Sequence, residues 1–405
     1  MKPFTANAHL QGAFEPWPNE GEINDLVVIG SIPEDLRGTY YRNGPNPQYV
    51  PDERYHLFDG DGMIHAFAFG DGRVRYRNKW VRTEKFDLER AAGRSLFGGM
   101  RNRWKDPSVA DRSPNAANTH VIRHGGKLLA LWEAGFPTEV DPCTLETMGP
   151  WDFHGRLDRA MTAHPKIDPA SGDLLFFSYA FGAARELVFF RADKAGAIVE
   201  SRKIPVPFHS MMHDFAVTEN FLIFPLFPLT LKPERMALGQ SPIAWEPGLG
   251  TRFALVPRRG SGDIHWFRTE ACFAFHFMNA YEDMSTNNGK GAVILDAIVG
   301  DRIPDNAKPF QGDKDEFPTR LIRWTLDVGT GEVSKEILDE TPCEMPRIDD
   351  RFCGRKYRHG YYIAQSRGEK PDGRWDTLAH FDFQSRTKRV LPFCDGDVVN
   401  EAVFV

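Results

Sequence analysis

Cysteine is scarce in this sequence, with five residues among 405. They are scattered and odd in number, and no C-x-x-C pair occurs that would indicate a zinc site or thiol exchange. Unpaired cysteine of this kind is usually a small buried residue. We therefore expect reduced and mostly buried thiols.

Long apolar runs are also lacking. No run approaches the length of about 18 residues that a membrane span needs, and the N-terminal residues do not have the pattern of a signal peptide. The 50 basic and 56 acidic residues give a net charge of -6 without any basic block. We expect a soluble, cytoplasmic protein, and the charge pattern argues against nucleic acid as a partner.

Several common catalytic signatures are absent as well. The sequence contains no G-x-S-x-G, H-E-x-x-H or G-x-G-x-x-G motif and no P-loop lysine. Serine hydrolases of the nucleophile-elbow type, zinc proteases and nucleotide-binding cradles therefore have no support.

Residues that favour turns are abundant. The chain has 36 glycines and 29 prolines, and runs of aromatic and β-branched residues alternate with Gly, Asp and Asn turns, which is typical of hairpins. No long helical period occurs, and residues 88–96 are the best candidate for a short helix. Many hairpins at regular spacing predict an all-β fold, and a β-propeller accommodates them most simply.

The segment 221–245 departs from the hairpin pattern. Two prolines interrupt an apolar run, and basic residues follow it. We predict an exposed apolar loop. It would either make a peripheral contact with a membrane or with an apolar substrate, or fold onto its own domain.

Three of the 13 histidines stand in apolar or aromatic settings just before a turn: His164, His213 and His276. Each alone would most often be a hydrogen-bonded core residue. Their spacing of roughly 50 to 60 residues, however, would allow successive propeller blades to bring one imidazole each to a shared metal, and Fe(II) is among the metals that suit such ligands. Carboxylates would then orient the rings, and the candidates in apolar settings are Glu133, Glu344 and Glu401.

Five stretches of this sequence resemble the carotenoid cleavage oxygenases, in the order of that family. They are Leu36-Arg37-Gly38-Thr39-Tyr40-Tyr41-Arg42-Asn43-Gly44-Pro45-Asn46-Pro47, His56-Leu57-Phe58-Asp59-Gly60-Asp61-Gly62-Met63, Ala163-His164-Pro165-Lys166, His213-Asp214-Phe215-Ala216-Val217-Thr218 and His276-Phe277-Met278-Asn279-Ala280-Tyr281-Glu282-Asp283. The resemblance covers residues 21–405.

The resemblance implies a seven-bladed β-propeller with a dome of loops and helices above Fe(II). The implied enzyme is a dioxygenase that cleaves a conjugated C=C bond of an apolar small molecule with O2 and gives two carbonyl products. It implies that His164, His213 and His276 bind the iron, and that Glu133, Glu344 and Glu401 hydrogen-bond the ligand histidines.

The resemblance also implies a fourth histidine ligand, in a stretch beyond the last glutamate that this chain does not contain. We therefore expect a single propeller domain over residues 1–405 that is incomplete at its C-terminus. The chain itself would then be inactive or bind metal more weakly.

Substrate choice is predicted from three positions. Phe58 matches a pocket aromatic of the family, and Met100 and Trp132 stand where stilbene-cleaving members hold a phenol with Tyr and Lys. This apolar replacement favours a carotenoid or apocarotenoid. The alternatives are a stilbene-cleaving dioxygenase, a retinoid-isomerising enzyme of the same family and a propeller that binds without catalysis.

Overall fold

The computed structural model describes residues 7–51, 55–99, 105–179, 184–232, 234–235, 241–260, 262–285, 291–303, 319–365, 375–394 and 396–405. Within these ranges the fold is all-β, with six four-stranded sheets and one two-stranded sheet. In five of the six larger sheets the strands pair in chain order, and in the remaining one β1 pairs with β4. These meanders are blades of the predicted β-propeller class. The prediction of seven blades is not confirmed, because the described residues form six.

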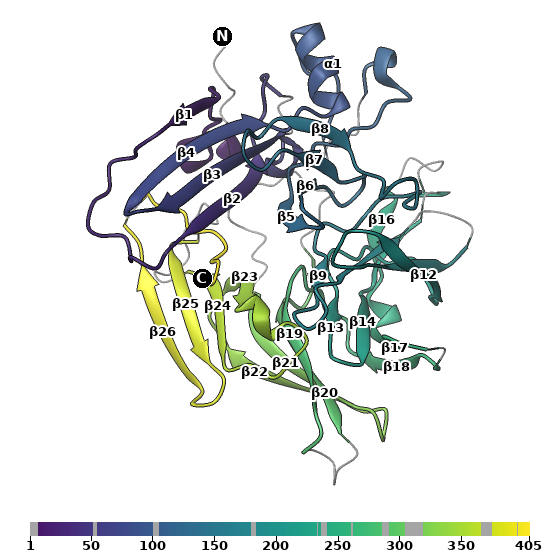
Figure 1. The fold of residues 1–405 in the computed structure, drawn as a ribbon. Coiled ribbons are helices and arrows are strands. Elements are labelled where there is room, and N and C mark those ends of the chain that lie inside the picture. The colour runs from purple at the N-terminus through teal and green to yellow at the C-terminus, as the bar shows by residue number, and fades with distance from the viewer. Residues whose placement is uncertain are drawn as a thin grey trace. The chain divides into compact units, whose positions relative to one another are not determined.

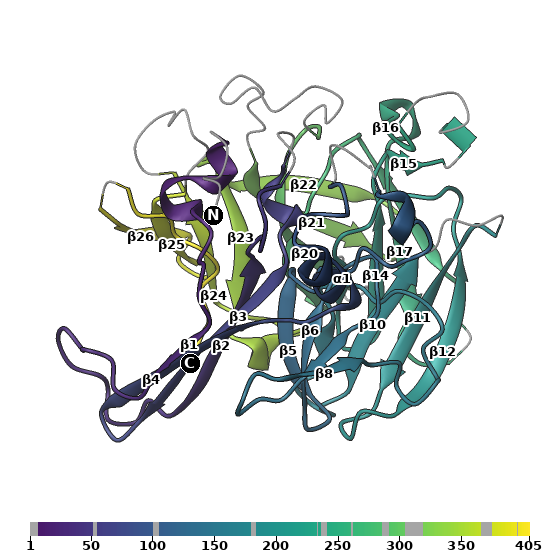
Figure 2. The ribbon, with the colours of Figure 1, turned by 90° about the horizontal axis from the view of Figure 1, so that it is seen from above.

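The chain divides into two compact units, of which the first comprises Met1–Ala163 and Phe190–Glu200. Two sheets lie in this unit, and buried side chains of both, such as Ile64 and Leu128, share one core. Figure 2 shows β2, β3 and β4 as long neighbouring strands of one sheet. The strands are β1 (Gly21–Ile23), β2 (Gly38–Pro45), β3 (Gly62–Gly70), β4 (Arg73–Trp80), β5 (His120–His124), β6 (Lys127–Leu131), β7 (Thr138–Val140) and β8 (Thr147–Pro150). The helices are η1 (Ala8–Leu10), η2 (Gly12–Phe14), η3 (Leu57–Asp59), α1 (Glu84–Ala92) and η4 (Pro107–Val109).

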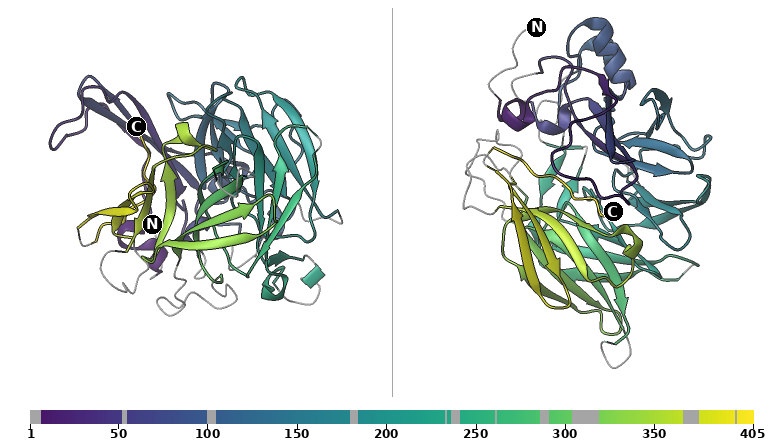
Figure 3. Two further views of the ribbon diagram at one scale, coloured as in Figure 1. Left: turned by 90° about the horizontal axis from the view of Figure 1, so that it is seen from below. Right: turned by 60° about the vertical axis from the view of Figure 1, so that its left-hand side comes forward.

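The second unit comprises His164–Phe189 and Ser201–Val405. Its sheets β13-β14-β17-β18 and β19-β20-β21-β22 share a core that includes Phe253 and Trp324, and the green and yellow strands of Figure 3 show β23 to β26 beside the latter sheet. The first strands are β9 (Lys166–Ile167), β10 (Leu174–Tyr179), β11 (Glu186–Ala192), β12 (Ile198–Pro205), β13 (Ala216–Val217), β14 (Phe221–Leu226), β15 (Leu229–Leu231), β16 (Ile243–Trp245), β17 (Thr251–Pro257) and β18 (His265–Thr269). The remaining elements are β19 (Phe277–Asp283), β20 (Ala292–Val299), β21 (Arg320–Asp327), β22 (Val333–Asp339), β23 (Cys343–Ile348), β24 (His359–Ala364), β25 (Thr377–Asp382), β26 (Thr387–Pro392), η6 (Pro247–Leu249) and η8 (Asp350–Phe352). Residues of β11 and β12 belong partly to each unit.

Turn chemistry explains why the predicted hairpins form. Asp71 and Gly72 connect β3 and β4 with φ of 52° and 71°, and Gly125 and Gly126 connect β5 and β6 with φ of 56° and 78°. Two consecutive residues with positive φ form a type I′ turn, whose twist matches that of the flanking strands. Both hairpins have the alternation of strand-forming runs with Gly and Asp turns on which the prediction of hairpins rests.

The predicted helix at residues 88–96 is wrong in its bounds. Helix α1 covers Glu84–Ala92 (Figure 1). The side chain of Thr83 accepts a hydrogen bond from the backbone N–H of Phe86, and Gly93 ends the helix with φ of 67°. These two caps, rather than the weak apolar period, set the ends of the helix.

The predicted exposed apolar loop at 221–245 is also wrong for its apolar part. Phe224, Leu226, Phe227 and Leu229 are buried, because β14 pairs with β17 inside a sheet and β15 pairs with β16. The two prolines did not exclude strand structure here. Residues 233 and 236–240 of the segment lie outside the described residues, and a peripheral membrane contact stays a prediction.

Three smaller expectations have mixed outcomes. All five cysteines are free thiols, but Cys143 and Cys394 are exposed and only Cys272 and Cys343 are fully buried, so "mostly buried" was wrong. Among the residues described, none of the helices has the length and apolar character that a membrane crossing requires. A single domain over residues 1–405 stays a prediction.

Candidate metal centre

The three singled-out histidines occupy equivalent places in three different sheets. His164 lies shortly before β9, His213 before β13 and His276 immediately before β19. Each of these strands is the first of its sheet in the chain. In each of these three sheets, a short apolar or aromatic stretch places one imidazole just before the first strand.

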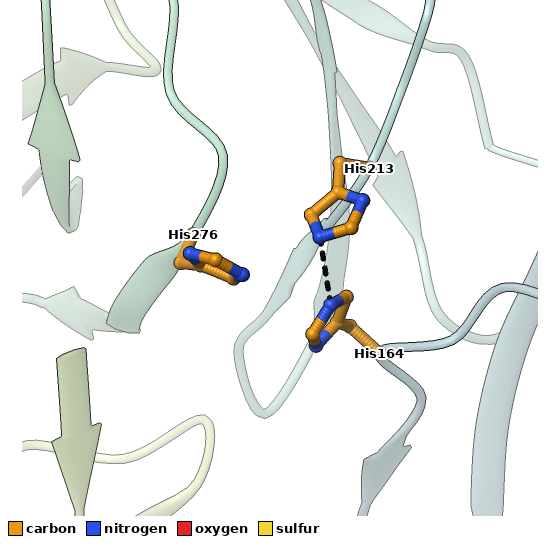
Figure 4. Close-up of side chains that lie close together, drawn as sticks. All are labelled: His164, His213 and His276. Carbon is orange, nitrogen blue, oxygen red and sulfur yellow. Dashed lines mark hydrogen bonds between the residues drawn. The ribbon is translucent and has the colours of Figure 1, made fainter. Parts of the chain in front are cut away.

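The structure brings these three imidazoles together. The Nε2 atoms of His164 and His213 are 2.8 Å apart, and the ring centroid of His276 lies 5.0 Å from that of His164 and 5.1 Å from that of His213. One ring nitrogen from each histidine lies within 4.8 Å of the others. Figure 4 shows the rings pointing toward a common centre. Sequence spacing predicted this convergence, and the geometry agrees with it.

Glu344 fixes the orientation of His276. Its Oε2 lies 2.8 Å from Nδ1 of His276 and accepts a hydrogen bond from Nδ1–H, which leaves the lone pair of Nε2 for a metal. Burial opposes protonation of His276, but the charge and hydrogen bond of Glu344, together with the charges of Asp214 and Glu401, raise the pKa of His276 above its ordinary value. The ring is therefore both oriented and made a stronger base.

A local distortion of β23 accompanies this carboxylate. The register between β23 and β24 shifts between Glu344 and Arg347, and Met345 has a φ of 53°. Positive φ is uncommon in residues with a side chain, and bulges re-aim side chains next to functional sites. The backbone N–H of Met345 also donates to Oε2 of Glu344, at 2.5 Å. The distortion thus holds the carboxylate in place.

The cluster has the chemistry of a site for a divalent metal. A histidine nitrogen binds a first-row metal at about 2.1 Å, so two nitrogens on one ion lie at most about 4.2 Å apart. The ligand nitrogens of the cluster lie within 4.8 Å of one another, and those of His164 and His213 are 2.8 Å apart. A small movement of the side chains would therefore place all three on one ion. In addition, Oε1 of Glu344 is buried without a hydrogen-bond partner among the described residues. That acceptor carries negative charge beside three neutral ligands, which favours a cation.

A buried aspartate next to His213 was missed by the sequence reasoning. Asp214 is 3% exposed, and its carboxylate accepts hydrogen bonds from Lys166 Nζ at 2.8 Å, from the backbone N–H of Phe215 at 2.8 Å and from that of Phe277 at 3.0 Å. Two charged residues in apolar surroundings could have indicated this contact. Asp214 directly follows His213, and Lys166 lies two residues after His164.

The other predicted residues have different outcomes. Glu401 belongs to the same unit as the cluster, and its charge contributes to the raised pKa of His276. Glu133 and Trp132 are half-buried residues that follow β6 in the first unit, and Phe58 on η3 is 51% exposed. Their assigned roles toward metal and substrate stay predictions. Met100 lies outside the described residues.

Comparison with known proteins identifies relatives along nearly the whole chain. The retinal pigment epithelial membrane protein family matches residues 14–405. Isoeugenol monooxygenase from Pseudomonas putida is 38% identical over 373 residues, which are 89% of this chain and 77% of that protein.

Two solved structures are similar in fold as well as in sequence. The lignostilbene dioxygenase of Pseudomonas brassicacearum superposes with a TM-score of 0.88 at 36% identity, covering 98% of this chain and 85% of that one. Cobalt-substituted apocarotenoid oxygenase from Synechocystis has a TM-score of 0.87 at 32% identity, covering 96% and 85%. The cobalt shows that this relative holds a metal ion.

Proposed function

This chain belongs to the family of the retinal pigment epithelial membrane protein and the carotenoid cleavage oxygenases, and from this premise we propose that it is a non-haem iron oxygenase. It would cleave a conjugated C=C bond of an apolar substrate with O2 into two carbonyl products. The observation that carries the proposal is the convergence of three imidazoles from three sheets.

The ligands would be the Nε2 atoms of His164, His213 and His276. When bound, Fe(II) would supply the redox chemistry by which O2 reacts with an alkene. The protein prepares this site: Glu344 accepts a hydrogen bond from Nδ1–H of His276, so that this ring presents Nε2. The ring of Phe275 packs 5.6 Å from that of His213 and supplies an apolar neighbour that limits water near the cluster.

For the substrate we propose first a carotenoid or apocarotenoid. The support is the sequence: apolar Met100 and Trp132 stand where a phenol anchor of Tyr and Lys would be expected, and a long polyene needs no such anchor. The similarity to an apocarotenoid oxygenase is consistent with this choice.

A second candidate is an aryl-alkene with a conjugated side chain. It is favoured by the similarity to an isoeugenol monooxygenase and to a lignostilbene dioxygenase, which share 38% and 36% identity with this chain. Both candidates require the same cluster and the same reaction type, so they differ only in which molecule is cleaved.

The test combines metal content with product analysis. The purified chain is loaded with Fe(II), and iron per chain is measured together with the aldehydes formed from an apocarotenal and from a hydroxystilbene under O2. We expect about one iron per chain and two carbonyl products from one of the substrates. The matched variants are His213→Ala, which should lose iron and product, and His265→Ala, which alters an exposed histidine on β18 and should lose neither.

Absence of iron in the loaded wild-type chain, or equal iron in both variants, would refute the proposed function. A product that keeps the carbon count of the substrate would instead indicate isomerisation.

A further inference from the structure

We infer that Asp214 is a positioning residue that sets the mutual placement of the three metal-binding histidines, with Lys166 as its partner. The inference rests on the proposed function, because it assigns Asp214 a task only if the cluster binds a metal. Asp214 would not bind the ion, and it would act through the segments that carry the ligands.

The hydrogen bonds of Asp214 reach all three ligand-bearing segments. Lys166, which donates to Oδ1 at 2.8 Å, lies two residues after His164. Asp214 itself follows His213 directly. Phe277, whose N–H donates to Oδ2 at 3.0 Å, is the neighbour of His276. One carboxylate therefore ties together three chain segments that are distant in sequence.

The chemistry of a carboxylate suits this task. Asp214 is 3% exposed, and an ionised carboxylate offers two oxygens that only accept hydrogen bonds. All three of its partners are donors, namely one ammonium and two backbone N–H groups. The ammonium of Lys166 compensates the charge that burial would otherwise make costly.

An amide could not replace the carboxylate. Asparagine would keep one acceptor oxygen and turn an NH2 group toward either Lys166 or the N–H of Phe277. Two donors facing each other would push one of these segments away, and the histidine next to it would move. A displacement of this kind alters metal binding without removing a ligand.

A matched control lies two residues after Lys166, just beyond strand β9. Asp168 follows β9, is 9% exposed and pairs with the guanidinium of Arg258. It also accepts a hydrogen bond from the backbone N–H of Ala170 at 2.8 Å. Asp168 is thus a buried, paired carboxylate, but neither partner adjoins one of the three histidines. Losing it should cost stability without disturbing the cluster.

The experiment is a Co2+ titration of the metal-free full chain, followed by the visible absorption of the bound ion and by equilibrium dialysis. It compares wild type, Asp214→Asn and Asp168→Asn, with the unfolding free energy of each variant measured in parallel. We expect Asp214→Asn to weaken Co2+ binding about 10- to 100-fold and to change the absorption bands of the bound ion. Asp168→Asn should leave the affinity within about twofold and leave the bands unchanged, whatever it costs in stability.

Lys166 provides a second test if Asp214→Asn does not fold. Lys166→Met removes the donor from Asp214 and should weaken Co2+ binding by roughly 10-fold, whereas Lys166→Arg keeps a charged donor and should restore most of the affinity. Equal affinity and equal spectra for wild type and a folded Asp214→Asn, or for wild type and Lys166→Met where Asp214→Asn does not fold, would overturn the inference. If wild type itself does not bind Co2+, or binds it equally well without His276, the proposed function fails instead.

Discussion

Two half-buried histidines, one in each unit, show what distinguishes a structural imidazole from a candidate ligand. On β3, Nδ1 of His65 lies 2.7 Å from the hydroxyl of Tyr76, and burial together with Arg42 lowers the pKa of His65 to about 4. Before β19, Nδ1 of His276 meets the carboxylate of Glu344, and the pKa of His276 is raised despite burial.

The difference lies in the partner rather than in burial. A neutral hydroxyl cannot compensate a charge on the ring, so desolvation decides the state of His65. A carboxylate compensates that charge and also fixes the tautomer, so that Nε2 of His276 faces its two neighbours. An imidazole with a carboxylate behind it and other imidazoles in front of it is arranged for a metal.

The largest expected effect comes from removing the imidazole itself. His276→Ala should lower the affinity for Fe(II) or Co2+ by more than about 100-fold, because one of three ligands is lost. His65→Ala removes an imidazole on β3 of the first unit that pairs with Tyr76, and should leave the affinity unchanged. Isothermal titration calorimetry of both metal-free variants with the metal ion measures the two affinities. Similar losses of affinity in the two variants would contradict this prediction.

A smaller effect is expected from the partners of the two rings. Glu344→Gln keeps a hydrogen-bonding group but loses the charge, and should weaken metal binding about 10- to 100-fold. Tyr76→Phe removes the partner of His65 and should not affect the metal. Metal content after dialysis measures both, and unchanged content in Glu344→Gln would show that the carboxylate does not support the ligand.

The third effect concerns pH and stability. Because the folded pKa of His65 is about 4 and the unfolded value is 6.5, the unfolded chain binds the extra proton between these values. The stabilising contribution is therefore present above pH 6.5 and is lost as the pH falls toward 4. The loss is about 2 kcal/mol, since each pKa unit is worth about 1.4 kcal/mol and the ring is partly exposed.

This pH effect is measured as a difference between two denaturation series of the metal-free protein. His65→Gln retains a hydrogen-bonding side chain but cannot titrate. The unfolding free energy of wild type minus that of the variant should decrease as the pH is lowered through this window. A difference that is independent of pH would contradict the lowered pKa.

The smallest effect is expected from Gly72, which lies in the turn between β3 and β4 of the first unit. Gly72 has a φ of 71°, and an added Cβ would meet no atom within 4 Å. Gly72→Ala should therefore cost only the strain of a positive φ, about 1 kcal/mol in urea denaturation. Metal affinity should be unchanged. A loss of several kcal/mol would mean that the turn does more than connect β3 and β4.

The sequence predicted those parts of the molecule that depend on local rules. The Asp71-Gly72 and Gly125-Gly126 turns follow from backbone sterics. The spacing of the three histidines along the chain follows from the repetition of blades, because each histidine precedes the first strand of a sheet. Burial of the run around Phe224 was not foreseen, because it depends on the strand β17 that pairs beside it.

The same limit applies to the site. His276 could be singled out by its aromatic setting, whereas the roles of Asp214 and Lys166 depend on hydrogen bonds between segments far apart in the chain. The bulge that aims Glu344 likewise arises from strand pairing. Local patterns indicate which residue types are available, and tertiary contacts decide which of them act together.

The most direct test of the account is X-ray absorption spectroscopy of the iron-loaded chain. The account predicts nitrogen ligands at about 2.1 Å with the outer-shell scattering of at least three imidazoles, reduced by one in His276→Ala. A spectrum without imidazole scattering, or one that His276→Ala leaves unchanged, would contradict the claim that these three histidines bind one metal ion.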